Sequence, residues 1–535
     1  MKQARDFAEI DAFLTDYRPL SPYGLAAKER TAFFAEPAPL EREYGLIERG
    51  LALLASAPAV AERLGARLKR LPALDFDLEG SLGLSELFLL KKFLLHVRGL
   101  FMDLPEDLRA AAGADWHSED LHRLLGQGSP VQEEEEEAFR LSESHIPELG
   151  EVRAGLEKLE GELRALRESW LQGLRQRLGL DFSGRDFLLV PAEETGRLFG
   201  EPDLLIEPFD GARVSVKLGL GARGLELATQ RERLIARERA LEAQVLAGLA
   251  AAAGQEAARV RGYQKAAERV DVWLAKARLA AAHRLARPRL REDGAAIEIQ
   301  GGRHVPLEAR NRALGLDYTP LTCVFDARVG ILHGSNMGGK TAALKTVALL
   351  QLLAQSGFFV PAESFATPLF ENIDYVGEDV REPVAGLSSF GLELNAVLGL
   401  LRRPDARRLV LMDEFAKTTN SREGAALLSA LLAAFWRRPA CRALATTHLA
   451  GLTLPSGAAA YRMRGFDAGA FRDFLGAEAD LPLAERLARI HRFMRYELVA
   501  DDGAPRVGDA LKVARVLGLD AEVVDEAERL LERSR

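Results

Sequence analysis

Cysteine is nearly absent from this 535-residue chain, which has Cys323 and Cys441 far apart in the sequence. Two such residues provide neither a metal-ligand spacing nor a disulfide framework. Long apolar runs are also missing, since none approaches the roughly 18 residues that a bilayer-spanning helix needs. The first residues, MKQARDFAEIDAF, carry charges where a signal peptide would be apolar. These absences predict a protein without membrane segments in a reducing cytoplasm.

An excess of positive charge is missing as well. The chain has 71 Lys and Arg against 79 Asp and Glu, a net charge of −8. This balance argues against a protein whose main surface grips nucleic acid, because phosphate contacts need clustered basic side chains. The hydrophobic fraction of 48% and the charged fraction of 28% are typical of a soluble globular protein. The length predicts roughly two to four domains.

A heptad pattern in the first half of the chain predicts a long helical arm. Apolar residues spaced alternately three and four apart follow one another over three heptads, at Leu149, Val152, Leu156, Leu159, Leu163, Leu166 and Trp170. Short strand patterns follow in residues 181–223, and a second long helix then has Leu227, Leu234 and Leu241 seven apart. The order predicts an antiparallel coiled-coil arm with a β tip. Two helices packed in an ordinary bundle are the alternative.

The pattern along the chain divides it into three predicted regions. Residues 1–125 indicate a helical core region, and residues 126–290 the arm with its tip. From about residue 320 apolar strands alternate with helices, which is typical of a largely parallel α/β sheet, so residues 291–535 form the third region. The predicted fold class is therefore multidomain α and α/β. No role is predicted for the first 80 residues.

The stretch GSNMGGKT at residues 334–341 fits the P-loop pattern G-x-x-x-x-G-K-[ST] in full. An apolar strand precedes it and a helix follows, as a phosphate-binding loop requires. Lys340 is predicted to reach the β- and γ-phosphates of ATP, and the Thr341 hydroxyl to ligate Mg²⁺. The predicted nucleotide-binding residues of the loop are Gly334, Ser335, Asn336, Met337, Gly338 and Gly339.

Two further strand ends carry candidate catalytic residues. The stretch RRLVLMDEFAKTTN places Asp413 and Glu414 after an apolar strand, where ligands of α/β sheets bind. Asp413 suits a Mg²⁺ ligand, and Glu414 suits an acceptor for the proton of the attacking water. An acidic pair that only caps a helix is the alternative. His448 ends the next strand and is predicted to bond the γ-phosphate or the water, although a lone histidine is more often structural.

Taken in this order, the motifs resemble the MutS family of ATPases within the ABC-type P-loop group. GSNMGGKT is similar to that family's G-P-N-M-G-G-K-[ST], and SSFGLEL at residues 388–394 resembles its S-T-F-x-x-E-[ML] signature segment. DEFAKTTNSREG at residues 413–424 aligns with D-E-x-G-R-G-T-x-x-x-[DE]-G. GGRHVPLE at residues 301–308 resembles the family's G-R-H-P connector, and residues 509–531 its C-terminal helices.

The resemblance implies a composite active site in a dimer. Ser388 and Ser389 of one subunit would complete the phosphate site of the other, in a homodimer or a heterodimer with a related chain. ATP would close the dimer and hydrolysis would reopen it, and the arms would amplify that change. Two features depart from the family pattern: no segment resembles the mismatch-reading domain, and Lys417, Thr418 and Thr419 replace its R-G-T.

The partner of the arms is predicted from the charge of the tip. Residues 181–223 contain eight Asp and Glu against five Lys and Arg, a net charge of −3, which disfavours a DNA-gripping clamp. The DEFAKTTN loop looks like that of short MutS-related ATPases associated with adenosylcobalamin-dependent mutases. The expected function is therefore a reactivase ATPase for an aminomutase of the lysine 5,6-aminomutase type. The alternative is a DNA-binding ATPase of repair or recombination that reads no mismatches.

Overall fold

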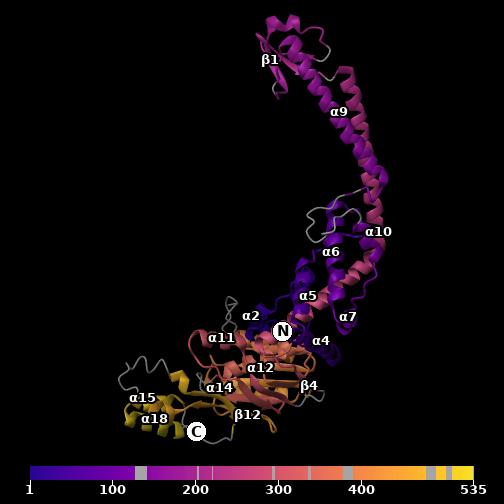
Figure 1. The fold of residues 1–535 in the computed structure, drawn as a ribbon. Coiled ribbons are helices and arrows are strands. Elements are labelled where there is room, and N and C mark those ends of the chain that lie inside the picture. The colour runs from indigo at the N-terminus through magenta and orange to yellow at the C-terminus, as the bar shows by residue number, and fades with distance from the viewer. Residues whose placement is uncertain are drawn as a thin grey trace. The chain divides into compact units, whose positions relative to one another are not determined.

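The computed structural model describes residues 1–126, 141, 143–182, 184–201, 204–219, 221–291, 296–334, 339–377, 389–477, 490–501, 509–517 and 519–533. The chain forms two compact units, each built from segments that are separate in the sequence (Figure 1). The first unit comprises Met1–Lys69, Asp103–Gly113 and Ala267–Arg535. The second comprises Arg70–Met102 and Ala114–Ala266. The fold is thus mixed α and α/β. The two units differ from the three consecutive regions predicted from the sequence, because each unit combines separate segments of the chain.

A six-stranded sheet forms the centre of the first unit. Its strand order is β13-β12-β7-β11-β10-β9, and neighbouring strands are parallel except for the edge strand β13. The strand that precedes the predicted P-loop, β7, is separated by β11 from β10, which carries the acidic pair. The bounds are β7 (Val329–His333), β9 (Asn372–Val376), β10 (Arg408–Asp413), β11 (Cys441–Thr447), β12 (Ala459–Phe466) and β13 (Met494–Ala500).

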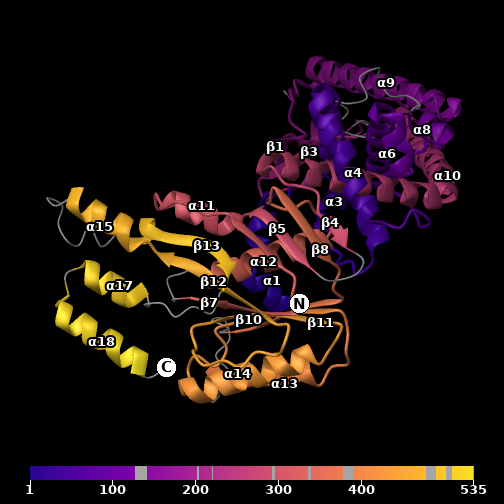
Figure 2. The same ribbon diagram turned by 90° about the horizontal axis from the view of Figure 1, so that it is seen from below.

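Alternating side chains of the central strands build two cores, one on each face of this sheet. Leu409 and Leu411 of β10 pack with the helix α12 (Lys340–Gln355), whereas Val410 and Met412 pack with α13 (Ser389–Leu401) and α14 (Ser421–Trp436). Figure 2 shows α13 and α14 on one side of the strands and α12 with α1 on the other. Both faces are covered, so every residue of β11 is buried.

N-terminal helices belong to the same unit as the sheet. The Tyr44 hydroxyl donates to the carbonyl of Ala354 in α12 at 2.7 Å, and Asp271 accepts from the backbone N–H of Ser21 at 2.6 Å. The segment before the arm therefore packs on α12, the helix that follows the predicted P-loop. The helices are α1 (Lys2–Phe7), α2 (Ile10–Phe13), α3 (Pro22–Glu29), α4 (Pro37–Ser56), α5 (Pro58–Arg70) and α7 (Glu106–Ala112).

Two smaller parts complete the first unit. A four-stranded sheet of order β4-β8-β5-β6 adjoins the helix α11 (Val305–Ala313); its strands are β4 (Arg289–Arg291), β5 (Ile297–Gly302), β6 (Leu321–Phe325) and β8 (Ser364–Pro368). Near the C-terminus, Phe471 packs with Phe466 and Met494 in a small core. The helices there are α15 (Ala468–Ala477), α17 (Asp509–Val516) and α18 (Ala521–Arg533).

Long helices dominate the second unit. Here α9 (Pro147–Leu178) runs antiparallel to the first half of α10 (Gly221–His283), since Glu148 pairs with Arg237 while Glu160, further along α9, pairs with the earlier residue Arg231. Every position of the predicted heptad seam in α9 is buried or partly buried. The shorter helices are α6 (Leu84–Asp103) and α8 (Glu119–Gly126). In the described residues of the chain, no helix combines the length and hydrophobicity needed to cross a membrane.

The tip between α9 and α10 is a three-stranded antiparallel sheet of order β1-β3-β2. One face packs on the C-terminal end of α9 through Val190 and Val216, which lie in a core that includes Leu174. The other face leaves Phe187 and Leu205 about half exposed, at 46% and 55%. The strands are β1 (Phe187–Pro191), β2 (Leu204–Pro208) and β3 (Arg213–Leu218).

Candidate functional site

The carboxyl ends of three neighbouring parallel strands bring the predicted site residues together. Gly334 follows β7, Glu414 follows β10, and His448 follows β11, which lies between the other two. Parallel strands end at one edge of the sheet, so residues more than 100 positions apart in sequence meet there. Four predicted loop residues, Ser335, Asn336, Met337 and Gly338, lie outside the described part of the chain.

Lys340 begins α12 and is almost fully buried, with 3% of its surface exposed. Its ammonium donates to the carbonyl of Gly334 at 2.7 Å and lies 3.4 Å from the Glu414 carboxylate. Burial lowers the pKa of Lys340, although the nearby charges of Glu414 and Asp413 work in the opposite direction. The lysine is therefore held over the loop in a place where an anion would stabilise its charge.

Gly339 precedes Lys340 in the left-handed region, with φ of 86°. A Cβ atom at this position would lie 2.9 Å from the Tyr496 ring, so a larger residue would clash as well as be strained. The glycine allows the chain to turn directly into α12 and to leave the first N–H groups of the helix without side-chain cover. Such a turn suits the binding of phosphate.

Asp413 is positioned by two hydroxyl groups. The Thr341 and Thr446 hydroxyls donate to the same carboxylate oxygen, at 3.0 and 2.5 Å. Burial raises the pKa of Asp413, and the two hydrogen bonds oppose that effect. A carboxylate beside a P-loop threonine hydroxyl is an oxygen donor set that fits Mg²⁺. Residue Thr446 was not predicted from the sequence, although a polar residue ending an apolar strand was a signal.

Glu414 turns out of β10 with a φ of 49°, which is unusual for a residue other than glycine. Its backbone N–H donates to the Thr446 hydroxyl at 3.0 Å, and its carboxylate lies 3.9 Å from Nδ1 of His448. The Glu414 side chain is 16% exposed and that of His448 is 37% exposed. Both predicted catalytic groups thus face the same space beside Lys340 and remain accessible from solvent.

The loop after Glu414 is fastened to the signature segment. Ala416 has a φ of 62°, and its N–H donates to the buried Glu393 carboxylate of α13 at 2.8 Å. This contact connects the acidic strand end to the helix that begins at Ser389. The predicted Ser388 lies outside the described residues, and of Ser389 the structure describes the backbone alone. The sequence placed Glu393 in the signature segment but did not predict it as a residue of the site.

A cavity of about 220 Å³ lies beside the beginning of α12. Gly339, Ala342 and Thr346 form one side of it, and Tyr318 and Tyr496 contribute aromatic rings. A cavity with aromatic rings next to a phosphate-binding turn has the character of a base-binding pocket. The remaining lining residues are Leu307, Asn311, Asp317, Thr319, Leu321, Ala343 and Met463.

Comparison with known proteins gives consistent similarities. The family model described as MutS domain V matches residues 330–534. The DNA mismatch repair protein MutS of Thermus thermophilus is 29% identical over 447 residues, covering 80% of this chain and 51% of that protein. Endonuclease MutS2 of Lactobacillus helveticus is 30% identical over 323 residues, covering 57% of this chain and 36% of that protein. DNA mismatch repair protein MutS 1 of Halobacterium salinarum is 29% identical over 408 residues, covering 73% and 44%.

The chain spans about half, or less, of the length of these curated relatives. The match of residues 330–534 to MutS domain V confirms the prediction of an ATPase. The names of the relatives support a function related to DNA better than they support the expected aminomutase reactivase. The alternative function, a DNA-binding ATPase of repair or recombination, therefore agrees better with these similarities than the reactivase does.

Proposed function

We propose that this protein is a Mg²⁺-dependent ATP hydrolase that acts on DNA in repair or recombination without reading mismatches. The convergence of Lys340, Asp413, Glu414 and His448 at one edge of a parallel sheet carries the enzymatic part of this proposal. The names of the relatives, DNA mismatch repair protein and endonuclease MutS2, support the part that concerns DNA. The proposal does not include cleavage of DNA, because the chain covers only 36% of the length of endonuclease MutS2.

The residues divide the work of hydrolysis by their chemistry. Lys340 and the N–H groups at the start of α12 bind the phosphates, and the base occupies the cavity beside Tyr318. Thr341 and Asp413 would hold Mg²⁺, which when bound would neutralise charge on the phosphate oxygens. Lys340, now 3.4 Å from Glu414, transfers its interaction to the phosphates when ATP binds. Glu414 is then able to orient a water and to accept its proton, with His448 beside it.

The second subunit is part of the same proposal. Ser388 and Ser389, at the beginning of α13, would contact the γ-phosphate held by a second copy or by a related chain. Because Glu393 of the same helix holds the Ala416 N–H behind Glu414, the signature helix and the catalytic loop would move together. Closure of the dimer would thereby depend on the nucleotide state of both sites.

The direct test uses the full-length protein with Mg-ATP and three readouts. Phosphate release should be abolished by EDTA, the mass in solution should double with ATP, and duplex or branched DNA should bind with an affinity that falls steeply with salt. Absence of turnover with and without DNA would overturn the enzymatic proposal. Turnover without any salt-dependent binding of DNA would overturn the part that concerns DNA alone.

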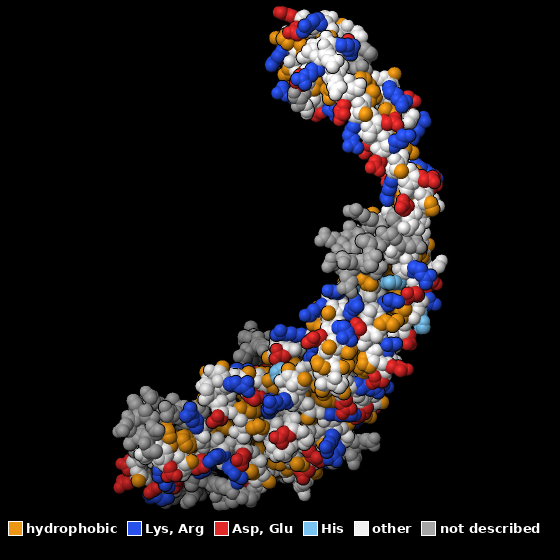
Figure 3. All heavy atoms as spheres, viewed as in Figure 1, with side chains coloured by type: hydrophobic (Ala, Val, Ile, Leu, Met, Phe, Trp, Pro, Cys, Tyr) orange, Lys and Arg blue, Asp and Glu red, His pale blue; other side chains and the backbone are white. Residues whose placement is uncertain are grey.

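A protein client is the second candidate, supported by the charges of the tip. Three of its basic side chains are already paired with carboxylates: Arg197 with Glu194, Arg213 with Asp210 and Lys217 with Glu207. On the face of the tip visible in Figure 3, Lys and Arg are interspersed with Asp and Glu. An adenosylcobalamin-dependent aminomutase as that client rests on the resemblance of the DEFAKTTN loop alone. Stimulation of ATP turnover by an inactivated mutase, without any effect of DNA, would favour this candidate.

A further inference from the structure

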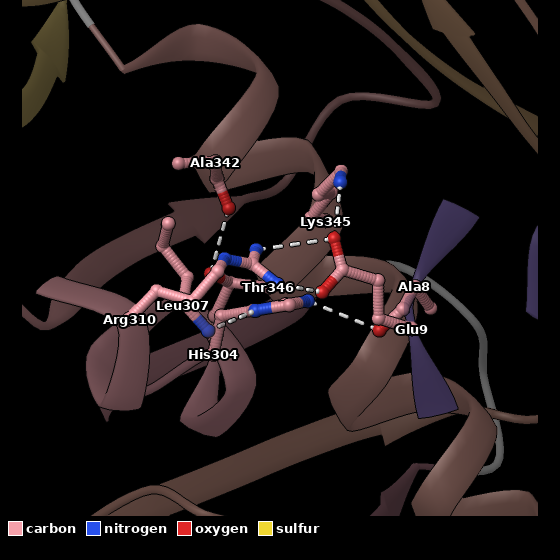
Figure 4. A network of polar contacts seen from close by, with 8 residues as sticks. All are labelled: Ala8, Glu9, His304, Leu307, Arg310, Ala342, Lys345 and Thr346. Atoms are coloured by element: carbon pink, nitrogen blue, oxygen red, sulfur yellow. Dashed lines mark hydrogen bonds and ion pairs between the residues drawn. The ribbon is translucent and has the colours of Figure 1, made fainter. Parts of the chain in front are cut away.

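Apolar side chains and one carboxylate join the N-terminal segment Met1–Tyr17 to the P-loop helix, α12, which begins at Lys340. Glu9 stands between α1 and α2 at a φ of 52°, so the chain turns sharply there and directs the side chain toward α12. One Glu9 oxygen lies 2.6 Å from the Lys345 ammonium, and the other lies 2.6 Å from the Arg310 guanidinium. Figure 4 shows the Glu9 carboxylate between these two cations.

The cations come from two different elements. Arg310 belongs to α11, whereas Lys345 lies in α12, five residues after Lys340. Burial alone would raise the pKa of Glu9, but the hydrogen bonds and charges of Arg310 and Lys345 outweigh it and lower the pKa from 4.5 to about 2. The carboxylate is therefore ionised at any working pH, and its charge-assisted hydrogen bonds to Arg310 and Lys345 persist.

Neighbouring contacts hold the turn itself in place. The buried His304 ring bonds the Ala8 carbonyl through Nε2 at 3.0 Å and accepts the Leu307 N–H through Nδ1 at 3.2 Å. The Phe7 ring stacks on Tyr375 of β9 with 4.1 Å between centroids. Since β9 pairs with β10, the same short segment contacts the P-loop helix and the strand beside the acidic pair.

We propose that Glu9 is a positioning residue of the nucleotide site, which fixes α12 and thereby sets the affinity for ATP. This inference rests on the proposed ATP hydrolysis and gives the N-terminal segment a role in it. Buried hydrogen bonds of Gln355 and of the Tyr44 hydroxyl hold the C-terminal end of α12. The Glu9–Lys345 ion pair instead holds its second turn, close to Lys340 and Thr341. Lys340 and Thr341 move with α12, but Glu414 follows β10 and does not. Loss of the Glu9 contact should therefore change binding more than the chemical step.

The test compares Glu9→Gln and Lys345→Gln with wild type in the full-length protein. Both variants should raise KM for ATP, and the dissociation constant of a fluorescent ATP analogue, by about tenfold, as expected for one charge-assisted hydrogen bond. In both, kcat should stay within about twofold. Lys345→Arg keeps the positive charge, so its affinity for ATP should be close to that of wild type. Asp11→Asn is the matched control, because it removes an exposed ion pair with Arg5 inside the same segment.

Each outcome decides the matter. Unchanged affinity in Glu9→Gln, with or without a lower melting temperature, would make the contact merely structural and overturn the proposal. An equal loss of affinity in Asp11→Asn would also overturn it, since the effect would not depend on α12. Wild-type protein that fails to bind the analogue would instead refute the proposed function. If Glu9→Gln does not fold, Lys345→Gln tests the same contact from the other side.

Discussion

The Thr446 hydroxyl donates to Asp413 at 2.5 Å and accepts the Glu414 N–H at 3.0 Å. One side chain of β11 thus orients both acidic residues of the neighbouring strand. The parallel register pairs Asp413 with Thr446, which places the hydroxyl beside the end of β10. The spacing of the acidic pair from the P-loop lysine is therefore determined by the strand between them, as well as by their own motif.

Thr446→Val should weaken Mg²⁺ binding without unfolding the protein. Valine has nearly the same shape but cannot donate to Asp413, and loss of such an outer contact typically lowers metal affinity by about 10- to 100-fold. The measurement is ATP turnover as a function of Mg²⁺ concentration, with the midpoint expected to rise about tenfold or more. Thr367→Val is the matched control. Thr367 lies in β8 of the other sheet, and its buried hydroxyl donates to the Gln351 side chain. Equal midpoints in the two variants would contradict this assignment.

Glu414→Gln should abolish hydrolysis while ATP remains bound. The amide cannot accept a proton from water, so a loss of about 100-fold or more in kcat is expected. Binding should persist or tighten, because Lys340 no longer has the Glu414 carboxylate 3.4 Å away as a competitor for the phosphates. Single-turnover hydrolysis and ATP-analogue binding measure the two effects. Glu423→Gln, on the exposed first turn of α14, serves as control. Undiminished turnover in Glu414→Gln would show that Glu414 is not the proton acceptor.

The sequence predicted the residues that carry the chemistry of the site better than the residues that position them. GSNMGGKT and the acidic pair are local motifs, so Lys340 and Asp413 could be assigned from spacing alone. Thr446 escaped notice because its partner lies 33 positions away and only the strand order makes them neighbours. Periodicity identifies a strand or a helix, but it contains no information about which strands become adjacent.

The same limit explains the N-terminal region. Its helices were expected in a region of their own, with no role for the first 80 residues. In the structure Glu9 pairs with Lys345, 336 positions further along the chain, and Tyr44 bonds Ala354. Nothing local marks such contacts, because a surface glutamate and a helix lysine are ordinary residues in any sequence. The long α9 and the tip strands, whose patterns are local, could be recognised from the sequence.

Ala416→Gly should cost the first unit much less stability than an ordinary alanine-to-glycine substitution. Alanine at a φ of 62° costs about 1–2 kcal/mol relative to an unstrained backbone, whereas glycine adopts this region freely. Glycine also loses more freedom on folding, and the fully buried methyl group of Ala416 is removed from the core. These effects nearly cancel, so the expected net change is within about 0.5 kcal/mol. Thermal unfolding measures it. Ala426→Gly, at an exposed position inside α14, should destabilise by about 1 kcal/mol instead. An equal loss of stability in the two variants would mean that this loop does not adopt the left-handed conformation.

Acid should destabilise the first unit through His304. Burial lowers the pKa of this ring from 6.5 to about 4, and the positive charges of Lys345 and Arg310 add to that effect, whereas Glu9 and the Ala8 carbonyl oppose it. Between those two pH values the unfolded chain binds a proton that the folded one rejects. The stability contributed by the neutral ring is therefore complete above about pH 6.5 and is lost as the pH falls toward 4.

His304→Asn separates this titration from the general effects of acid. A difference in pKa of this size corresponds to on the order of 3 kcal/mol. Asparagine can still accept the Leu307 N–H at the start of α11 but does not ionise, so its melting temperature should fall less than that of wild type between pH 7 and pH 5. At pH 7 the variant should be less stable, since the Ala8 carbonyl loses its partner. His283→Asn, on a partly exposed ring beside Asp16, controls for the loss of any histidine. Parallel melting curves for wild type and His304→Asn would show that the ring binds a proton equally well in the folded and the unfolded chain, which would contradict the lowered pKa.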